Sequence, residues 1–515
     1  MRKKLLCLLL ATVLVLSTTG VAAFAGQPDR TYTYEDSEAV PSTNIYQVKT
    51  IVDESVMGIE RMLEPADLFV DNSDRVFILD QYKYKDEKGN EVINSRVIIL
   101  NKDYTLLKEL REFTHGEETL KLAAGAKGLF YREANSSLYI ADTENDRVVV
   151  CDLEGKVSKI YTLPQDELLE KAKNFKPQKI IVDNMGIMYV ASGDPEVGVN
   201  GAMMIDSANN FLGFYGTNKL KLTASMKIEF LWRSILTDEQ NAQSSESYQP
   251  VEFFNLFWSE DRFVYAVSPI LENMESTVVK LNALGKNVFA QSIDFYSIQE
   301  TSKVKNMQPV DLTVDNEGVF TIVDATSGRL FQYDENCNLL AIFGGIGYQK
   351  GLFTRPSSIE SDSENNLLVL DAVKCTITVM EQTYYGEMIR TANNLYNEGR
   401  YVESVEPWQD VLRMNANYIR AYVGMGKACL AMENEEAIAE FGKGKYEQAM
   451  EFFKSGKDQE GYAEAKAGLR DEIVRANFGL VAAIVVLAMI AILAYDQIKN
   501  TINNIVWKFS RRKGE

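Results

Sequence analysis

Carboxylate side chains, rather than histidines or cysteines, are the groups of this sequence that have the spacing for chemistry. Three acidic segments resemble calcium-binding turns: Asp71-Asn72-Ser73-Asp74, Asp315-Asn316-Glu317-Gly318 and Asp362-Ser363-Glu364-Asn365. Hard cations take oxygen ligands, so these segments are candidate Ca²⁺ sites. The same residue types also form tight turns, because Asp, Asn and Gly suit turn backbones. Turn formation is the favoured interpretation, and we expect no cofactor.

Four further aspartates recur at equivalent points of repeated segments and indicate a structural role. A carboxylate in such a place can hold a loop by accepting hydrogen bonds from backbone N–H groups. An arginine follows two of these aspartates at the same spacing. The recurring residues are Asp80, Asp142 with Arg147, Asp324 with Arg329, and Asp371.

Catalytic motifs are missing from the sequence. His115 is the single histidine, whereas metal hydrolases and lyases commonly need several His ligands or a His base. No phosphate-binding loop, nucleophile elbow, dinucleotide fingerprint or paired-cysteine zinc pattern is present. We therefore expect a protein that is not an enzyme.

Short strands must position these residues, and residues 308–356 show one full set. Apolar runs at 311–314, 319–323, 330–333 and 339–343 are separated by turn-forming segments, which predicts four antiparallel strands. A glycine-rich segment, FGGIG, then leads through Gly351 and Phe353 to Pro356, where the next set begins.

This segment resembles the repeat of the NHL β-propeller family. The resemblance rests on the VDNEG turn, on Asp324 and Arg329 at the second and third strands, and on the FGGIG crossover. Related copies begin near residues 65, 125, 176, 250 and 355, at a period of roughly forty residues. The resemblance implies an all-β six-bladed propeller over residues 46–383. Because the last copy supplies three strands, we expect residues 46–53 to complete it.

Long insertions gather on one face of the expected propeller, which predicts that binding occurs there. They fall at residues 81–95, 111–124, 164–175, 193–200, 218–249 and 297–307, in second-to-third loops and in crossovers between blades. The longest has a helix-compatible pattern over 219–243. The candidate binding residues are Phe230, Trp232 and Arg233 from this insertion, and Tyr82 and Tyr84 from the first. An alternative is that Phe230 and Trp232 only pack on the rim.

The two ends of the chain predict a membrane-tethered protein. Residues 1–25 have a basic start, an apolar run and Ala23-Phe24-Ala25 before the expected cleavage, as in a signal peptide. Residues 476–496 are expected to form a membrane helix, because 478–495 within them is uncharged and apolar and close to the roughly 20 residues that such a helix needs. The basic amphipathic tail, 497–515, is expected in the cytoplasm by the positive-inside rule. The propeller then lies outside the cell membrane, with its loop-rich face away from the bilayer.

Residues 385–475 are helical in pattern and resemble TPR-type helix pairs followed by a stalk. The turns Gly399-Arg400-Tyr401 and Gly444-Lys445-Tyr446 each open a helix, and their separation requires an additional helix or turn between them. Such a short array is as consistent with a spacer as with a peptide-binding segment.

Net charge and cysteine content limit the class of partner and the compartment of the protein. The formal net charge is -19, which disfavours nucleic-acid binding because phosphate backbones are repelled. Cys151, Cys337, Cys375 and Cys429 are too scattered for a disulfide framework, although pairing of Cys337 with Cys375 stays open. Sparse cysteines and the compact signal suit a bacterial envelope.

Two functions from different classes are consistent with these features. The first is a non-catalytic extracytoplasmic binding or scaffold protein that recognises a protein or a glycan, as a transporter accessory within a membrane transport complex or as a sensor. The second is a gluconolactonase-like hydrolase with a carboxylate-bound divalent cation in the propeller channel.

Overall fold

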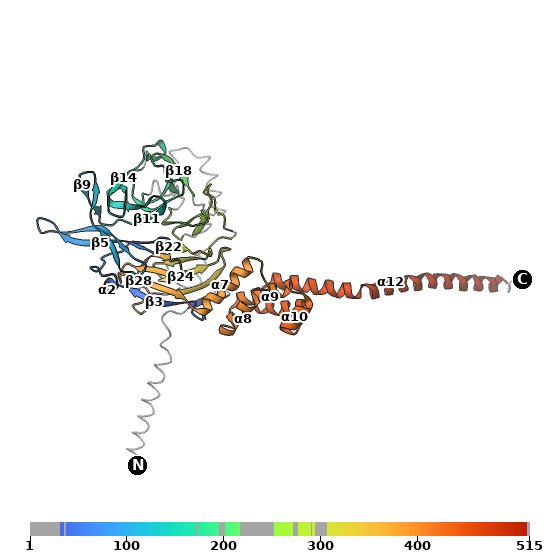
Figure 1. Ribbon diagram of the computed structural model, residues 1–515. Coiled ribbons are helices and arrows are strands. Elements are labelled where there is room, and N and C mark those ends of the chain that lie inside the picture. The colour runs from blue at the N-terminus through green and yellow to red at the C-terminus, as the bar shows by residue number, and fades with distance from the viewer. Residues whose placement is uncertain are drawn as a thin grey trace, which may run out of the picture. The chain divides into compact units, whose positions relative to one another are not determined.

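Six antiparallel sheets form a β-propeller in the N-terminal unit of the protein, Met1–Glu387, and a helical unit, Met388–Glu515, follows it. The structure is a computed structural model (Figure 1). It describes residues 31–35, 38–170, 172, 174–194, 201–216, 252–270, 277–289, 291–293 and 306–511. The first strand of each blade contacts the first strand of the next, and the sixth contacts the first, so the ring closes.

The blades follow one another in sequence. Blade 1 contains β4 (Asp67–Val70), β5 (Val76–Lys85), β6 (Glu91–Leu100) and β7 (Leu106–Leu110), with β10 (Leu122–Ala123) also paired to β6. Blade 2 contains β11 (Gly128–Arg132), β12 (Ser137–Asp142), β13 (Arg147–Cys151) and β14 (Val157–Tyr161). Blade 3 contains β15 (Pro177–Val182), β16 (Met188–Ser192), β17 (Ala202–Ile205) and β18 (Phe211–Tyr215).

The second half of the ring is built in the same way. Blade 4 has β19 (Asn255–Trp258), β20 (Val264–Val267) and β21 (Val278–Leu281), followed by isolated bridges at Asn287 and Ile293. Blade 5 has β22 (Pro309–Val314), β23 (Phe320–Asp324), β24 (Arg329–Tyr333) and β25 (Leu339–Gly344). Blade 6 has β26 (Pro356–Ser361), β27 (Leu367–Asp371), β28 (Thr376–Gln382) and β3 (Tyr46–Val52).

Strand β3 closes the ring, as the sequence predicts. It pairs with β28 in antiparallel register from Ile377↔Val52 to Gln382↔Tyr46. Tyr46 and Val52 are buried at the two ends of this strand, while the residues between them alternate in exposure. The two ends of the propeller sequence therefore share one sheet, and blade 6 has its fourth strand.

A hairpin precedes β3 in the chain. Strands β1 (Thr31–Glu35) and β2 (Glu38–Ser42) pair with each other, and β1 also joins β25 through Tyr32↔Ile342. The alternation of Thr and Tyr in TYTYE is a strand pattern, but its partner lies about three hundred residues away in the chain. Only the folded ring provides that edge.

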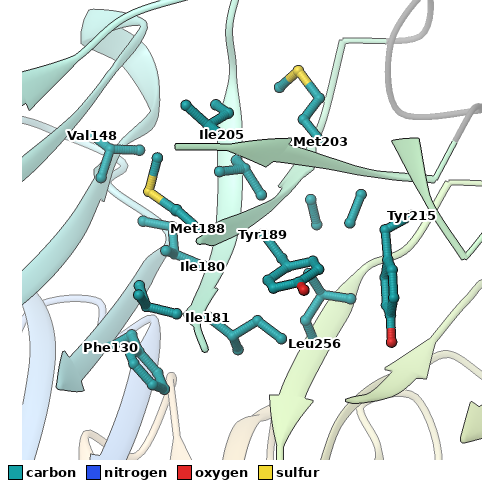
Figure 2. Packing of buried hydrophobic residues seen from close by; sticks show 14 of the residues in the cluster. Phe130, Val148, Ile180, Ile181, Met188, Tyr189, Met203, Ile205, Tyr215 and Leu256 are labelled. Carbon is teal, nitrogen blue, oxygen red and sulfur yellow. The ribbon is translucent and has the colours of Figure 1, made fainter. Parts of the chain in front are cut away.

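Apolar side chains between adjacent blades form the propeller core. Figure 2 shows part of the cluster that joins blades 2, 3 and 4, where Phe130, Ile181, Tyr189 and Leu256 gather. Similar clusters lie between blades 1 and 2, 4 and 5, and 6 and 1. Strands buried on both faces read as apolar runs rather than as strict alternation, which is why second strands such as β16, β20 and β27 are mainly apolar.

The helical unit contains the extra helices that the spacing of the two turns requires. The series begins in the last residues of the propeller unit. It comprises α7 (Tyr384–Asn397), α8 (Val405–Met414), α9 (Ile419–Ala431), α10 (Asn434–Phe441), α11 (Lys445–Ser455) and α12 (Gln459–Arg511). Gly424 allows close packing, since a Cβ atom there would lie 2.2 Å from Nε1 of buried Trp408.

Helix α12 is continuous through the apolar stretch and into the tail. Within the described residues, one segment is long and apolar enough to cross a membrane, Ala482–Trp507, with a mean hydropathy of 1.8 and none of that window buried. This segment extends beyond the 476–496 expected from sequence, because Ile498, Ile502 and Ile505 continue its apolar character.

The remaining short elements lie in connections. They are α2 (Glu54–Met57), the paired strands β8 (Phe113–His115) and β9 (Glu118–Leu120), and the 3₁₀ turns η1 (Glu133–Asn135), η2 (Thr143–Asn145) and η3 (Glu167–Leu169). The crossover from blade 1 to blade 2 is thus a small hairpin followed by β10, not an irregular loop.

Candidate functional site

The two ends of the propeller ring differ in construction. We call the end with the first-to-second and third-to-fourth turns the turn face, and the end with the second-to-third loops and blade crossovers the crossover face. On the turn face, a carboxylate closes each of four turns by accepting hydrogen bonds from two N–H groups of its own turn, at 2.8–3.1 Å. These carboxylates are Asp71, Asp183, Asp315 and Asp362.

The three calcium-like segments therefore have their leading carboxylates engaged in turns. Asp74 of the first segment accepts hydrogen bonds from Ser363 and Lys102, so it also has partners. Within the described ranges, no group of three or more His, Cys, Asp or Glu side chains is placed to hold a metal ion. The hydrogen bonds at these positions are those of turns.

The recurring aspartates hold the crossovers. Asp80 accepts hydrogen bonds from the N–H groups of Leu63 and Glu64 at 3.0 and 3.1 Å. The equivalent residues accept from the crossover that enters their own blade: Asp142 from Ala123, Asp324 from Gln308, and Asp371 from Thr354 and Arg355.

Arginine partners differ from blade to blade. Arg147 pairs with Asp142 at 2.7 Å. In blade 1 the equivalent partner of Asp80 is Arg96, also at 2.7 Å, and its side chain is nearly fully buried. A long hairpin separates the two residues in sequence, but they lie directly opposite each other in the paired strands. Arg329 instead lies over the ring of Tyr32, 5.9 Å from its centroid. Burial raises the pKa of Asp80 above its usual value, although Arg96 opposes this effect.

The first insertion on the crossover face is an ordered hairpin arm. Strands β5 and β6 stay paired from Asp80↔Arg96 to Lys85↔Glu91, and β5 projects beyond the blade (Figure 1). Tyr82 and Tyr84 stack on each other at 5.6 Å, Arg111 lies over Tyr82 at 5.0 Å, and Lys121 lies over Tyr84 at 4.5 Å. Tyr82 is thus 6% exposed and covered by its own chain, whereas Tyr84 is half-buried.

Phe230, Trp232 and Arg233, with the expected helix over 219–243, lie outside the described residues, and so does the signal segment 1–25. The crossover face nevertheless presents exposed apolar side chains within its described part. Tyr348 is 85% exposed, and Ile346 and Val373 are also exposed. Lys374 donates hydrogen bonds to the carbonyls of Gln349 and Leu352, which connects the last loop of blade 6 to the crossover that carries Tyr348.

A polar ring that the sequence did not indicate surrounds the centre of the propeller. It consists of one residue from the first strand of each blade, always at the equivalent position. In β22 and β26 this is the third residue of the strand. We call it the central ring. Its members are Asp67, Gly128, Lys179, Asn255, Asp311 and Ser358, and the five side chains are all buried.

The ring side chains join five of the six blades. Nζ of Lys179 donates to both carboxylate oxygens of Asp67 at 2.7 and 2.9 Å. Asp311 accepts from Ser358 at 2.5 Å and from Asn255 at 2.6 Å. Oγ of Ser358 also lies 3.2 Å from Asp67, so its one proton is shared between the two carboxylates and polar contacts run from blade 3 through blades 1, 6 and 5 to blade 4.

The same side chains satisfy the inner sheet edges. Leu129 N–H donates to Asp67, Ile359 N–H donates to Asp311, and Leu68 N–H donates to Ser358. These N–H groups belong to the innermost strands, whose inner edge has no further strand to pair with. Buried backbone N–H groups need partners, so the central ring performs this structural task.

Gly128 leaves space for the close approach of blade 3. A Cβ atom at this position would lie 2.3 Å from the carbonyl oxygen of Gln178 and 3.0 Å from the Cα of Lys179. Blade 3 could not approach blade 2 so closely if residue 128 had a side chain. Asp67, Lys179, Asp311 and Ser358 each follow a proline by two residues, which marks equivalent positions in the sequence but does not show that their side chains meet.

Glu360 lies one inward position further along β26 and adds a third buried carboxyl group. Its Oε2 accepts a hydrogen bond from Thr313 at 3.3 Å. Burial, followed by the charge of Asp311, raises the pKa of Glu360 well above its usual value. Burial likewise raises the pKa of Asp311 to about 6. Burial lowers the pKa of Lys179, but the nearby Asp67 and Asp311 carboxylates outweigh it, so the net change is upward.

The donor set of the ring does not fit a divalent metal. Both oxygens of Asp67 accept from Lys179, and both oxygens of Asp311 accept from Asn255, Ser358 and backbone N–H groups. A lysine ammonium thus occupies the position that a metal would take between these carboxylates. A second cation there would be repelled by Lys179.

His115 and the cysteines provide no reactive group in this region. His115 is exposed on the β8–β9 hairpin rather than in an irregular loop. The four described cysteines are buried and free, and burial raises the pKa of Cys337 to about 12. Cys337 lies in the β24–β25 turn on the turn face and Cys375 in the β27–β28 loop on the crossover face, so they do not pair.

Comparison with known proteins gives similarity of fold. No protein-family model and no curated protein matches the sequence. Solved structures that resemble the chain include virginiamycin B lyase from Staphylococcus aureus, with 10% identity and a TM-score of 0.35 over 62% of this chain and 97% of that one. A protein of unknown function from Bacteroides thetaiotaomicron has 13% identity and a TM-score of 0.39 over 69% and 91%. Hydrazine synthase from Kuenenia stuttgartiensis has 11% identity and a TM-score of 0.35 over 63% and 96%. Likeness at this level carries no conclusion about activity, ligand or partner.

Proposed function

We propose that the protein is a membrane-tethered, extracytoplasmic binding or scaffold protein of the NHL-propeller kind. The observation that carries this proposal is the difference between the two propeller faces. The turn face has short turns whose carboxylates bind their own backbone. The crossover face has the hairpin arm and the long connections. Loops on a rigid scaffold are where binding residues gather.

The C-terminal helix supports the membrane part of this proposal. Residues Ala482–Trp507 of α12 are apolar and unburied, as a lipid-facing helix would be. The basic tail behind the span supports a propeller outside the cell, by the positive-inside rule. In this arrangement the crossover face recognises a protein or a glycan, in the role of a transporter accessory or a sensor.

Site-specific photocrosslinking tests which face binds. Tyr348 on the crossover face and Met185 on the turn face are matched, because their exposed fractions are 85% and 81%. Each is replaced by a photoreactive amino acid in the full-length protein within its native membrane. We expect adducts from position 348 and few from 185. Equal adducts from both positions, or adducts from 185 alone, would contradict the proposal.

A metal-dependent lactonase is the second candidate, favoured by the three carboxyl groups Asp67, Asp311 and Glu360 near the propeller centre. The hydrogen-bond donors that already surround Asp67 and Asp311 count against it. Metal analysis of the purified full-length protein separates the two candidates. A stoichiometric divalent metal whose removal abolishes lactone hydrolysis would replace the binding proposal with the enzymatic one.

A further inference from the structure

The charges at the propeller centre do not balance. Asp67, Asp311 and Glu360 are three buried carboxyl groups, and within the described part of the chain Lys179 is the buried cationic side chain whose charge acts on all three. Burial of an uncompensated charge is costly, so such groups are paired or are neutralised by a proton. Asp67 is paired with Lys179. One positive charge therefore serves three acidic groups.

Hydrogen-bond acceptors at the centre also outnumber the donors. Asn255 is 7% exposed, and its Nδ2 donates to Asp311 and to the carbonyl of Val310. These two acceptors fix the orientation of the amide, which leaves its Oδ1 buried and without a hydrogen-bond partner among the described residues. A buried acceptor without a donor is unfavourable. The centre is thus short of positive charge and of hydrogen-bond donors, and protonation of one carboxyl group removes a negative charge and adds one donor to the cluster.

The contacts decide which carboxyl group carries the proton. Asp311 accepts hydrogen bonds from Asn255, Ser358 and the N–H groups of Leu312 and Ile359, which favours its ionised form. Among the described residues, Glu360 has one donor, Thr313, on the neighbouring strand β22. Lys179 on β15 is already bound to Asp67 on β4. Glu360 is therefore the group that gains most from protonation.

We propose that the propeller centre is a proton-binding site in which Glu360 carries a proton at neutral pH, so that contacts among the innermost strands respond to external pH. Loss of the proton places two negative charges, on Glu360 and Asp311, between β26 and β22. Repulsion then acts between blades 6 and 5, whose connecting crossover carries Tyr348. The proposal does not depend on what the crossover face binds.

The direction of the pH dependence follows from linkage. A carboxyl group whose folded pKa is raised binds more protons in the folded state than in the unfolded state. Its contribution to stability is complete below the unfolded pKa and is lost as the pH rises through the folded value. Glu360 and Asp311 both shift upward, so both weaken the fold as the pH rises. Exposed carboxylates with a lowered pKa, such as Asp86, make the fold more stable as the pH rises. The quantity to measure is therefore the difference in stability between a variant and the wild type at each pH.

Glu360→Gln tests the proposal, because it removes the titrating group and keeps its shape. We expect the melting temperature of the full-length variant to match the wild type at pH 5 and to exceed it increasingly toward pH 9.5. The amide hydrogens of β22 and β26 should exchange more slowly in the variant than in the wild type at high pH. The amides of β16 in blade 3 serve as the reference and should not change. Glu335→Gln, an exposed residue of blade 5, serves as the control and should show a constant difference from the wild type.

Infrared difference spectroscopy gives a readout that is independent of stability. The carbonyl stretch of a protonated carboxylic acid should be present in the wild type at pH 7 and missing from Glu360→Gln. A Glu360→Gln difference in melting temperature that is constant across pH would overturn the proposal. A second result would also overturn it: at high pH, the wild type melts at a higher temperature in K⁺, Na⁺ or Ca²⁺ than in choline at equal ionic strength. A metal ion would then supply the missing charge.

Discussion

At the scale of single residues, buried ion pairs hold the crossovers to the blades. Asp80 and Arg96 lie opposite each other in β5 and β6, and their side chains are 0% and 1% exposed. Arg96 also donates to Glu109 and to the carbonyl of Glu60. Removal of Asp80 would leave the buried charge of Arg96 only partly compensated, by Glu109, and breaking a buried pair in this way costs more than the pair contributes.

Asp80→Ala should therefore destabilise the propeller by about 3–5 kcal/mol. The control is Asp142→Ala, since the side chain of its partner Arg147 is 21% exposed and water can hydrate it. We expect the control to lose about 2 kcal/mol, as for a hydrogen bond to a charged group. Urea unfolding monitored by pulse proteolysis measures both variants. Equal losses would show that burial of the arginine does not set the cost.

Gly128→Ala tests the space between blades 2 and 3. Its added methyl group would overlap the carbonyl of Gln178, which is backbone and cannot rotate away. A loss on the order of 3 kcal/mol is expected for forced overpacking. Gly89→Ala, at the tip of the hairpin arm, has nothing within 4 Å and should cost about 1 kcal/mol because of its positive φ. Thermal unfolding of the two variants compares these effects, and a loss at Gly128 no larger than at Gly89 would contradict the steric argument.

At the scale of elements, strand β3 determines whether the ring is closed. It is the outer strand of blade 6, and its buried residue Val52 packs with Ile377 and Val379 in the core between blades 6 and 1. Closure by a strand from the other end of the sequence makes the propeller cooperative, because blade 6 is incomplete until both ends of its sequence have been folded together.

Val52→Asp should open this closure, since it places a charge at a 0% exposed position and costs several kcal/mol. Ile51→Asp is the matched control, because Ile51 is the neighbouring residue, 36% exposed on the opposite side of the strand. Hydrogen exchange of β28 reports the result. Val52→Asp should remove its protection and Ile51→Asp should leave it nearly intact. Protection of β28 in both variants would show that the ring stays closed without this contact.

At the scale of the whole molecule, helix α12 gives the protein its expected membrane attachment. Leu487→Arg combined with Ile490→Arg should prevent insertion, because each arginine near the centre of a membrane helix costs about 3 kcal/mol. Cell fractionation with alkaline extraction should move this variant to the soluble fraction. Ile473→Arg, an exposed position before the apolar segment, should remain with the membrane. Retention of the double variant would place the attachment elsewhere.

Sequence alone determined the parts of this protein that depend on local pattern. The turn residues, the apolar runs and their period indicated the six blades, and even the closing role of β3, because a repeat with three strands requires a fourth. The uncharged stretch before the basic tail indicated the apolar C-terminal helix in the same way. These features arise from neighbours in the chain, which a sequence displays directly.

Tertiary structure decided what depends on residues that are distant in sequence. Asp67, Lys179 and Asp311 belong to three blades, and neither their contacts nor their burial follows from any local pattern. The pairing of Asp80 with Arg96 across the hairpin arm, and of β1 with β25, were hidden for the same reason. A propeller brings equivalent positions of all its repeats together at its axis, so the charged centre exists only once the ring has closed.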